Sequence, residues 1–277
     1  QANSYSTDEN AAYRFKNKEA LVICEKVISK FPKSEGAKKC AVLKLKINQK
    51  QLQITSEKYI PTNTFSKVLV DYKNVDSLYF SVYKITTSQL QSIYKKYNQE
   101  EKIAEINKLQ KVKSWTTKLR NEFDYLQHKT EVIVPQLKAG NYLIISSTSK
   151  KLSGNKIYGI ANFQSTNLTL VDVYETDKKV YQVVDRITGK PIKNATIHIK
   201  NEPDRYNKNS INKTLKTNRK GFAALHDNKN YGNTTITVSK EEDVELVVSN
   251  SINQLGGCHV LINNAGIYGP KDKFELI

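Results

Sequence analysis

Apolar residues near the start of the chain recur with the period of an α-helix. Those in residues 21–28 share one helical face, and a second face of this kind runs through residues 37–45. The intervening residues 31–36 carry a proline and a glycine, and Ser34 has the short hydroxyl side chain that favours a helix N-terminus. The sequence therefore predicts a helical hairpin within residues 1–50.

The period changes to two in residues 52–87, which is typical of β-strands. Leu78, Phe80 and Val82 face one side of such a strand, and the residues between them face the other. Residues 88–115 are charged and predict a helical insertion. Further strands are expected at residues 129–134, 137–147 and 163–174, the last of them closing the first β domain.

A second β module is predicted around residues 180–200. Two runs rich in β-branched residues, 180–184 and 195–199, flank a segment with turn chemistry. Gly189 can adopt a positive φ, and Pro191 has a fixed φ and no N–H to donate. The residues expected to build this structural turn are Asp185, Thr188, Gly189 and Pro191. Another turn followed by a strand is expected at residues 217–225.

These elements predict a mainly β protein with helical additions. We expect a helical hairpin, then two antiparallel Ig-like β-sandwich domains, then a short α/β fragment. The expected boundaries are 1–50 for the hairpin, 51–173 for the first sandwich with its insertion at 88–115, 174–240 for the second sandwich, and 241–277 for the fragment.

Two of the three cysteines fall at matching positions of the predicted hairpin. Cys24 and Cys40 each lie eight residues from Pro32, so antiparallel helices would bring them to the same height. An oxidising compartment would then allow a disulfide. In a reducing compartment they would be two buried thiols that pack as small apolar residues. The sequence leaves both alternatives open.

The turn and its surroundings resemble the second macroglobulin-like domain of the bacterial alpha-2-macroglobulin family, particularly its large Bacteroidetes members. A strand ends there in D-x-x-T-G-K-P, followed by A-x-V/I and a T-x-x-x-G return. The matching residues here are Asp185, Thr188, Gly189, Lys190, Pro191, Ala195, Ile197, Thr217 and Gly221. The hairpin and the segment 72–84 are similar to the helical and first macroglobulin-like parts of the same family. The resemblance covers about residues 11–240.

This resemblance implies a non-catalytic structural or interaction segment. Longer members of the family trap proteases through a bait region and often a Cys-x-Glu-Gln thioester, and this chain has neither. The expected partner is a protein, in the longer protein a protease, and the expected location is the periplasm or the cell surface. No oligomeric state follows from the sequence.

The last forty or so residues are similar to a different family, the short-chain dehydrogenase/reductases. The resemblance rests on an apolar helix expected to reach Leu255, a strand at residues 258–262 and an N-N-A-G motif. The motif residues are Asn263, Asn264, Ala265 and Gly266. We interpret the tail as fused to the β body near residues 235–245. The alternative function is therefore an NAD(P)-dependent dehydrogenase fragment.

The residues that such a dehydrogenase needs are missing from this sequence. No Gly-rich turn that could hold a pyrophosphate precedes the motif, and no Tyr-x-x-x-Lys pair follows it. We therefore expect an inactive remnant that binds no cofactor. No other stretch has catalytic spacing, and the histidines have no second ligand at metal spacing. These isolated histidines are His128, His198, His226 and His259.

The chain is strongly basic, with 44 Lys and Arg residues against 27 Asp and Glu, a net charge of +17. Such a charge would suit a nucleic-acid binder. The lysines are scattered along every element, however, and no arginine cluster or nucleic-acid motif accompanies them. We therefore expect no nucleic-acid partner. No apolar run approaches the roughly 18 residues of a membrane span, so none is expected.

Overall fold

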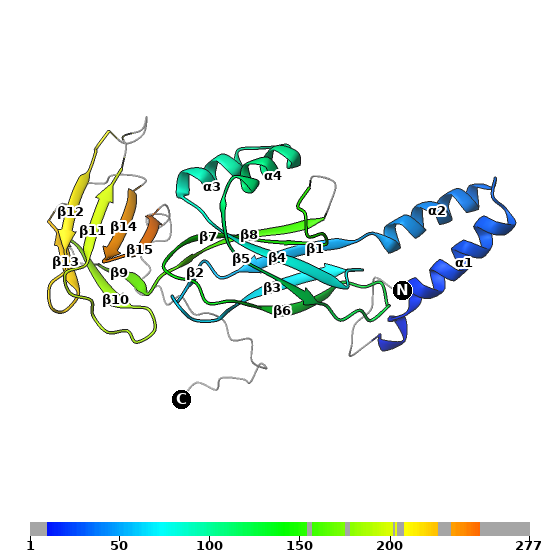
Figure 1. Ribbon diagram of the computed structural model, residues 1–277, viewed down its shortest axis with the longest axis horizontal. Helices are drawn as coiled ribbons and strands as arrows, with labels where there is room; N and C mark the ends of the chain where they lie inside the picture. Colours follow the sequence, from blue (N-terminus) through cyan, green and yellow to red (C-terminus); the bar gives the residue numbers. More distant parts are fainter. Residues whose placement is uncertain are drawn as a thin grey trace. The chain divides into compact units, whose positions relative to one another are not determined.

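The computed structural model describes residues 10–153, 157–174, 178–201, 203, 208–226 and 234–249 (Figure 1). The chain divides into two compact units, one ending at Ser165 and the other beginning at Thr166. Both are built mainly from antiparallel β-sheets, as the hydrophobic pattern predicted. Each unit is described by itself.

The first unit is a β-sandwich of two sheets. One has three strands in the order β1-β3-β6, and the other has five in the order β2-β8-β7-β4-β5. All neighbours are antiparallel except β2 and β8. The strands are β1 (Gln51–Ser56), β2 (Tyr59–Ile60), β3 (Ser66–Lys73), β4 (Ser77–Lys84), β5 (Gln110–Lys118), β6 (His128–Val134), β7 (Gly140–Ser147) and β8 (Tyr158–Ser165).

The core of this sandwich follows from the alternation of apolar residues. Leu78, Phe80 and Val82 on β4 point inward and are almost fully buried, which confirms the predicted face. They pack against Val68 and Val70 of β3 in one cluster. Each such side chain stabilises the fold by about 1.5–3 kcal/mol through burial. The core therefore lies between the two sheets.

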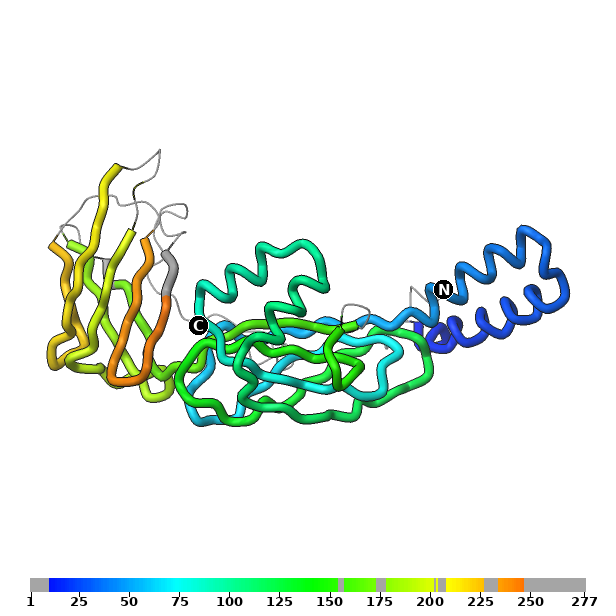
Figure 2. Tube along the Cα trace, turned by 45° about the horizontal axis from the view of Figure 1, so that its top comes forward, coloured from blue at the N-terminus to red at the C-terminus, as the bar shows by residue number. Residues whose placement is uncertain are grey.

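Two helices, α3 (Thr87–Tyr94) and α4 (Gln99–Asn107), cover part of the outer face of the five-stranded sheet (Figure 2). Ile93 of α3 and Ile106 of α4 pack against Leu143 and Ile145 of β7. A capping box at Thr86 begins the first helix, with its hydroxyl accepting from the N–H of Gln89. These helices explain why β7 is apolar on both faces.

The predicted helical insertion is too long. Helix α4 ends at Asn107, and β5 covers residues expected to be helical. The lysines of this segment suggested a solvated helix. In the structure β5 instead pairs with β4 and satisfies its backbone groups, and Trp115 stacks on Phe80 with ring centroids 5.1 Å apart. Tertiary pairing overrides the local charge pattern here.

The predicted helical hairpin is confirmed. Helices α1 (Lys16–Lys30) and α2 (Glu35–Asn48) follow a short 3-10 turn, η2 (Ala11–Tyr13). The Ser34 hydroxyl accepts a hydrogen bond from the N–H of Ala37, at 3.1 Å, and begins α2 as expected. The hairpin is joined to the sandwich at its end, where the Asn74 amide donates to the carbonyl of Ile47.

The second unit is also a sandwich. A three-stranded sheet in the order β13-β10-β9 packs on a four-stranded sheet in the order β12-β11-β14-β15. All pairs are antiparallel. The strands are β9 (Leu168–Tyr174), β10 (Lys179–Asp185), β11 (Thr196–Lys200), β12 (Asn212–Lys216), β13 (Phe222–Leu225), β14 (Thr234–Lys240) and β15 (Asp243–Ser249).

The boundary expected between residues 173 and 174 lies eight residues earlier. The predicted closing strand, 163–174, is two strands, because β8 belongs to the first sandwich and β9 pairs with β10 along its length. Leu168 is buried in the second core. A single apolar run could not show where one sheet ends and the next begins.

The end of the second sandwich also differs from the prediction. Residues 241–277 were expected to form a dehydrogenase-like fragment with a helix that reaches Leu255, but β15 pairs with β14 in seven consecutive positions. A junction at residues 235–245 is therefore wrong, because the β body continues to Ser249. The resemblance to a dehydrogenase helix gave no sign of this strand, in which Glu245 is buried while Val244 is partly exposed.

Candidate functional site

The residues of the predicted structural turn form a closed loop at the end of β10. Asp185 Oδ1 accepts hydrogen bonds from the N–H of Ile187 at 3.1 Å and from the N–H and hydroxyl of Thr188, both at 2.8 Å. Gly189 has a φ of +68° and donates its N–H to the Asp185 carbonyl. The loop closes where the Asp185 N–H donates to the carbonyl of Lys190 at 2.8 Å.

The electrostatics of this loop fit a structural role. Burial raises the pKa of Asp185, but hydrogen bonds from Thr188 and Ile187, together with the charge of Lys190, outweigh it and hold the pKa below its usual range. The carboxylate is thus ionised at neutral pH. Its Oδ1 is occupied by three donors of the same loop, so it caps a turn rather than serving as a base.

The chain then runs back along β10 before it crosses to the other sheet. Pro191 forms a β-bridge with Val184, and the Ile192 N–H donates to the carbonyl of Val183 at 2.9 Å. Beyond this point Ala195 is fully buried and leads into β11. Because β10 and β11 lie in different sheets, this connection links the two layers of the sandwich.

Thr217 and Gly221 hold this connection in place. The Thr217 hydroxyl donates to the carbonyl of Ile192 at 2.7 Å and accepts from the N–H of Ala195 at 2.9 Å. Gly221 has a φ of +77°, and a Cβ at this position would lie 2.6 Å from the carbonyl oxygen of Val183. Only a residue without a side chain fits there. The structure thus brings together all the motif residues from Asp185 to Gly221.

A buried ion pair, which sequence reasoning missed, lies in the same unit. Arg186 Nη2 lies 2.8 Å from Glu245 Oε1, and both side chains are largely buried. Arg186 also donates to the carbonyls of Thr166 and Leu168. Burial raises the pKa of Glu245 to about 7, although Arg186 opposes the shift. The signal that could have revealed it is the spacing of Asp243 and Glu245, which places both carboxylates on one face of a strand.

These two carboxylates bind the backbone of the neighbouring sheet. Asp243 accepts a hydrogen bond from the N–H of Asn167, and Glu245 accepts one from the N–H of Leu170, both at 2.8 Å. Strands β15 and β9 are the edges of their sheets. The carboxylates therefore satisfy edge donors that would otherwise be free to pair with another chain.

The two cysteines of the hairpin lie together. Cys24 is buried and Cys40 is partly buried, and both are free thiols in the structure. Burial raises the pKa of Cys24, and the neighbouring Cys40 thiol raises it further. Buried thiols of this kind react slowly. The structure describes the reduced pair, and the disulfide stays a prediction.

The histidines occupy separate sites. His128 binds the buried carboxylate of Asp124 at 2.8 Å, and His198 binds the amide of Asn212 at 2.7 Å, whereas His226 is exposed. No group of three His, Cys, Asp or Glu side chains in the described ranges could hold a metal ion. His259 and the motif Asn263, Asn264, Ala265 and Gly266 lie outside the described residues.

Asp124 also anchors the start of the chain to the first sandwich. Its carboxylate accepts from Arg14 Nε at 3.2 Å and from the N–H of Leu126 at 3.1 Å. Burial raises the pKa of Asp124, but the hydrogen bonds from His128, Leu126 and Arg14 together lower it below its usual value. The helical hairpin is thus tied to this loop from its N-terminal side.

No helix in the described part of the chain is both long and apolar enough to cross a bilayer. The longest, α1, has 15 residues and carries lysines along its length.

No protein-family model and no curated protein matches this sequence. Among solved structures, a fragment of native alpha-2-macroglobulin from Escherichia coli spanning domains NIE-MG1 aligns with 72% of this chain and 97% of its own length, at 10% identity and a TM-score of 0.49. A fragment spanning MG0-NIE-MG1 aligns over 72% and 64%, at 11% identity and a TM-score of 0.49.

A reconstruction of the native conformation of the same E. coli protein aligns with 72% of this chain, at 10% identity and a TM-score of 0.42. The chain spans 64% of the MG0-NIE-MG1 fragment and 13% of the chain in that reconstruction. At these identities and TM-scores, none of the three defines the family of this chain.

Proposed function

We propose that this chain is a non-catalytic scaffold and interaction segment of an alpha-2-macroglobulin-like protein. The observation that carries the proposal is the connection between β10 and β11. Most motif positions that resemble the family, from Asp185 to Gly221, fall on this one feature, where Asp185, Thr217 and Gly221 each have a physical task. A chance match spread over 37 residues would not be expected to converge in this way.

The chemistry of the connection supports a role without catalysis. The polar side chains of Asp185, Thr188 and Thr217 are all bound to the backbone or to a neighbour in the same loop. None of them is placed to attack or to move a proton on a substrate. What remains is a rigid sandwich that presents its surfaces. The proposed partner is a protein, in the longer protein a protease, and the proposed location is the periplasm or the cell surface.

The test compares two proteins, the product of the whole gene and this chain alone. If the proposal holds, the longer product should retain trypsin on gel filtration, and the retained trypsin should cleave small peptides but not protein substrates. This chain alone should leave trypsin unaffected, because it lacks a bait region and a thioester. A whole gene without further macroglobulin-like domains, or without any retention of trypsin, would overturn the proposal.

The alternative is a dehydrogenase fragment, supported by Asn263 to Gly266 alone. It predicts a saturable change of NAD(P)H fluorescence on titration with the chain, whereas the scaffold proposal predicts none. A steep salt dependence of DNA binding would instead indicate a nucleic-acid binder. Both titrations use the chain as it is and separate the three classes of function.

A further inference from the structure

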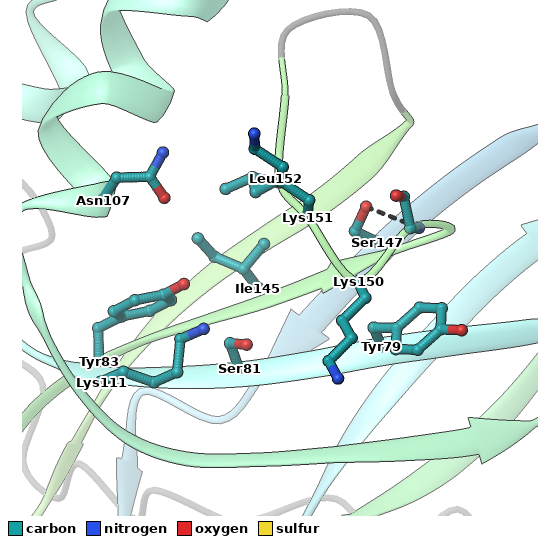
Figure 3. A pocket seen from close by; sticks show the side chains of 11 residues that line it. Tyr79, Ser81, Tyr83, Asn107, Lys111, Ile145, Ser147, Lys150, Lys151 and Leu152 are labelled. Atoms are coloured by element: carbon teal, nitrogen blue, oxygen red, sulfur yellow. Dashed lines mark hydrogen bonds between the residues drawn. The ribbon is translucent and has the colours of Figure 1, made fainter.

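A concavity of about 520 Å³ lies on the outer face of the five-stranded sheet of the first unit (Figure 3). Its floor is formed by the stripe Tyr79, Ser81 and Tyr83 of β4, whose side chains share one face because they are two residues apart. Its volume is within the range of about 300–1,000 Å³ found for small-molecule sites. No function proposed above uses it.

The walls of the concavity are cationic. Lys111, Lys150 and Lys151 line it, and none of the eleven described residues around it is acidic. None of the three ammonium groups lies within ion-pairing distance of a carboxylate of the described residues. Most surface lysines gain little from any one ion pair. Three that surround one hollow create a positive potential that favours an anion.

The aromatic and hydroxyl groups suggest what carries the negative charge. Figure 3 shows Tyr83 beside Lys111 at one end and Tyr79 beside Lys150 at the other, with Ser81 between them. The Lys111 ammonium lies 5.5 Å from the centre of the Tyr83 ring. Tyr83 is buried in the cluster beneath α3 and α4, whereas Tyr79 is only half-buried. Tyr79 is therefore the aromatic ring on which one ring of a hydroxylated ligand can lie.

Polar groups inside the hollow remain open to such a ligand. The Ser81 hydroxyl and the Asn107 amide have no hydrogen-bond partner among the described residues, whereas Ser147 already accepts from the N–H of Ser149. An acidic peptide is a poorer fit. Extended peptides bind sheets through a free edge, and both edges of β4 are paired, with β5 and β7.

We infer that this concavity binds an acidic oligosaccharide, a short chain of hydroxylated rings that carry carboxylate or sulfate groups. The lysines contact the anionic groups, Tyr79 lies along one ring, and Ser81 and Asn107 bind hydroxyls. The site is independent of the proposed family, because it uses none of the residues of the β10–β11 connection.

The test is an NMR titration of the ¹⁵N-labelled chain with digalacturonate and with a heparin-derived disaccharide. We expect saturable shifts of the amides of β4 and of residues 149–152. The variant Lys111→Gln/Lys150→Gln/Lys151→Gln should bind at least tenfold more weakly. The control Lys33→Gln/Lys39→Gln/Lys118→Gln removes the same charge from exposed lysines outside the hollow, and it should change the affinity less than threefold.

Further ligands separate the sources of binding. Maltose should bind at least tenfold more weakly, because it lacks the charge. Equal binding of tetraglutamate or of sulfate alone would overturn the inference, since the rings would then contribute nothing. An equal loss of affinity in both triple variants would mean that binding is general electrostatic attraction, and it would also overturn the inference. The absence of shifts at about 10 mM ligand, a concentration that reveals weak sites, would overturn the inference as well. Thermal melting of each variant shows whether it is folded.

Discussion

Glu245 on the last described strand accepts a hydrogen bond from the main-chain N–H of Leu170 on β9, across the two layers of the second sandwich. The contact shows that residues just beyond Lys240 are part of the β body. It also places a carboxylate, paired with Arg186, where water is largely excluded. The pH dependence of stability should therefore report on it.

The first prediction concerns Glu245→Gln. Burial raises the pKa of Glu245 from 4.5 to about 7, so its contribution is largest below pH 4.5 and is lost as the pH rises through 7. This loss is on the order of 3 kcal/mol. The glutamine variant keeps a carbonyl acceptor and cannot ionise, so its stability should fall less between pH 5 and pH 8. Urea unfolding followed by far-UV circular dichroism measures both slopes.

Glu242→Gln is the matched control, because Glu242 is exposed and directly precedes β15. It should keep the slope of the unsubstituted chain. If Glu245→Gln and Glu242→Gln have the same pH dependence, the raised pKa is not a property of the buried pair.

The second prediction compares two glycines with similar backbone angles. Gly189 and Gly221 have φ values of +68° and +77°, but a Cβ on Gly189 would meet nothing within 4 Å, whereas one on Gly221 would collide with the carbonyl of Val183. Gly189→Ala should cost about 1 kcal/mol from backbone strain alone. Gly221→Ala should cost at least about 3 kcal/mol, because β10 must also move.

Urea unfolding of the two variants under identical conditions measures the difference. Equal destabilisation would contradict the close approach of Gly221 to β10. A larger effect at Gly189 would mean that the loop at Asp185 holds the sandwich together more strongly than the layer crossing does.

Much of this fold could be predicted from the sequence because local and tertiary forces agree there. On β4 every second residue is apolar, and the sandwich buries Phe80 and its neighbours on that face. At the hairpin, Ser34 provides a cap where the helical period restarts. At the turn, Gly189 and Pro191 specify angles that few other residues adopt.

The remaining elements could not be predicted because the contacts that define them come from residues far away in the sequence. Strand β5 is rich in lysine and is defined by its pairing with β4 and by Trp115. Strand β15 turns Glu245 inward, where only Arg186 and a distant backbone N–H make the burial tolerable. Both partners are far away in sequence. The lysine-lined hollow likewise combines residues from three separate segments.

The third prediction concerns Asp124→Asn in the first unit. Asp124 is buried and is bonded to the partly exposed side chains of Arg14 and His128, so neutralising it should cost about 2 kcal/mol at pH 7, as for hydrogen bonds to charged groups. The pKa of Asp124 is lowered below 3.8, so its stabilisation is present above that pH and lost as the pH falls through the folded-state value. The stability of the variant should therefore approach that of the unsubstituted chain in acid.

Trp115 is the only tryptophan of the chain and lies in the first unit, so its fluorescence during urea unfolding follows this unit alone. Glu131→Gln is the control, since Glu131 forms an exposed ion pair with Lys67 and should cost about 0.5 kcal/mol or less. A cost for Asp124→Asn that stays constant from pH 7 to pH 3 would argue against an ionised carboxylate at the anchor.

The last prediction concerns the thiols of the helical hairpin. Burial and the neighbouring thiol raise the pKa of Cys24, so little thiolate is present at neutral pH. Cys40 is more exposed on α2. Iodoacetamide should therefore modify Cys40 of the reduced, folded chain at least tenfold faster than Cys24, as read by mass spectrometry of the peptides. Both should react at similar rates in urea, which serves as the control.

The same experiment tests the predicted disulfide. Mild oxidation of the folded chain should protect both cysteines from iodoacetamide together, and a reductant should restore both. The crosslink joins residues 16 positions apart, a loop for which about 3 kcal/mol of stabilisation is expected. If oxidation instead protects Cys40 alone, or joins two chains, the two thiols do not pair within the hairpin, and Cys24 is simply a small apolar residue of the helix interface.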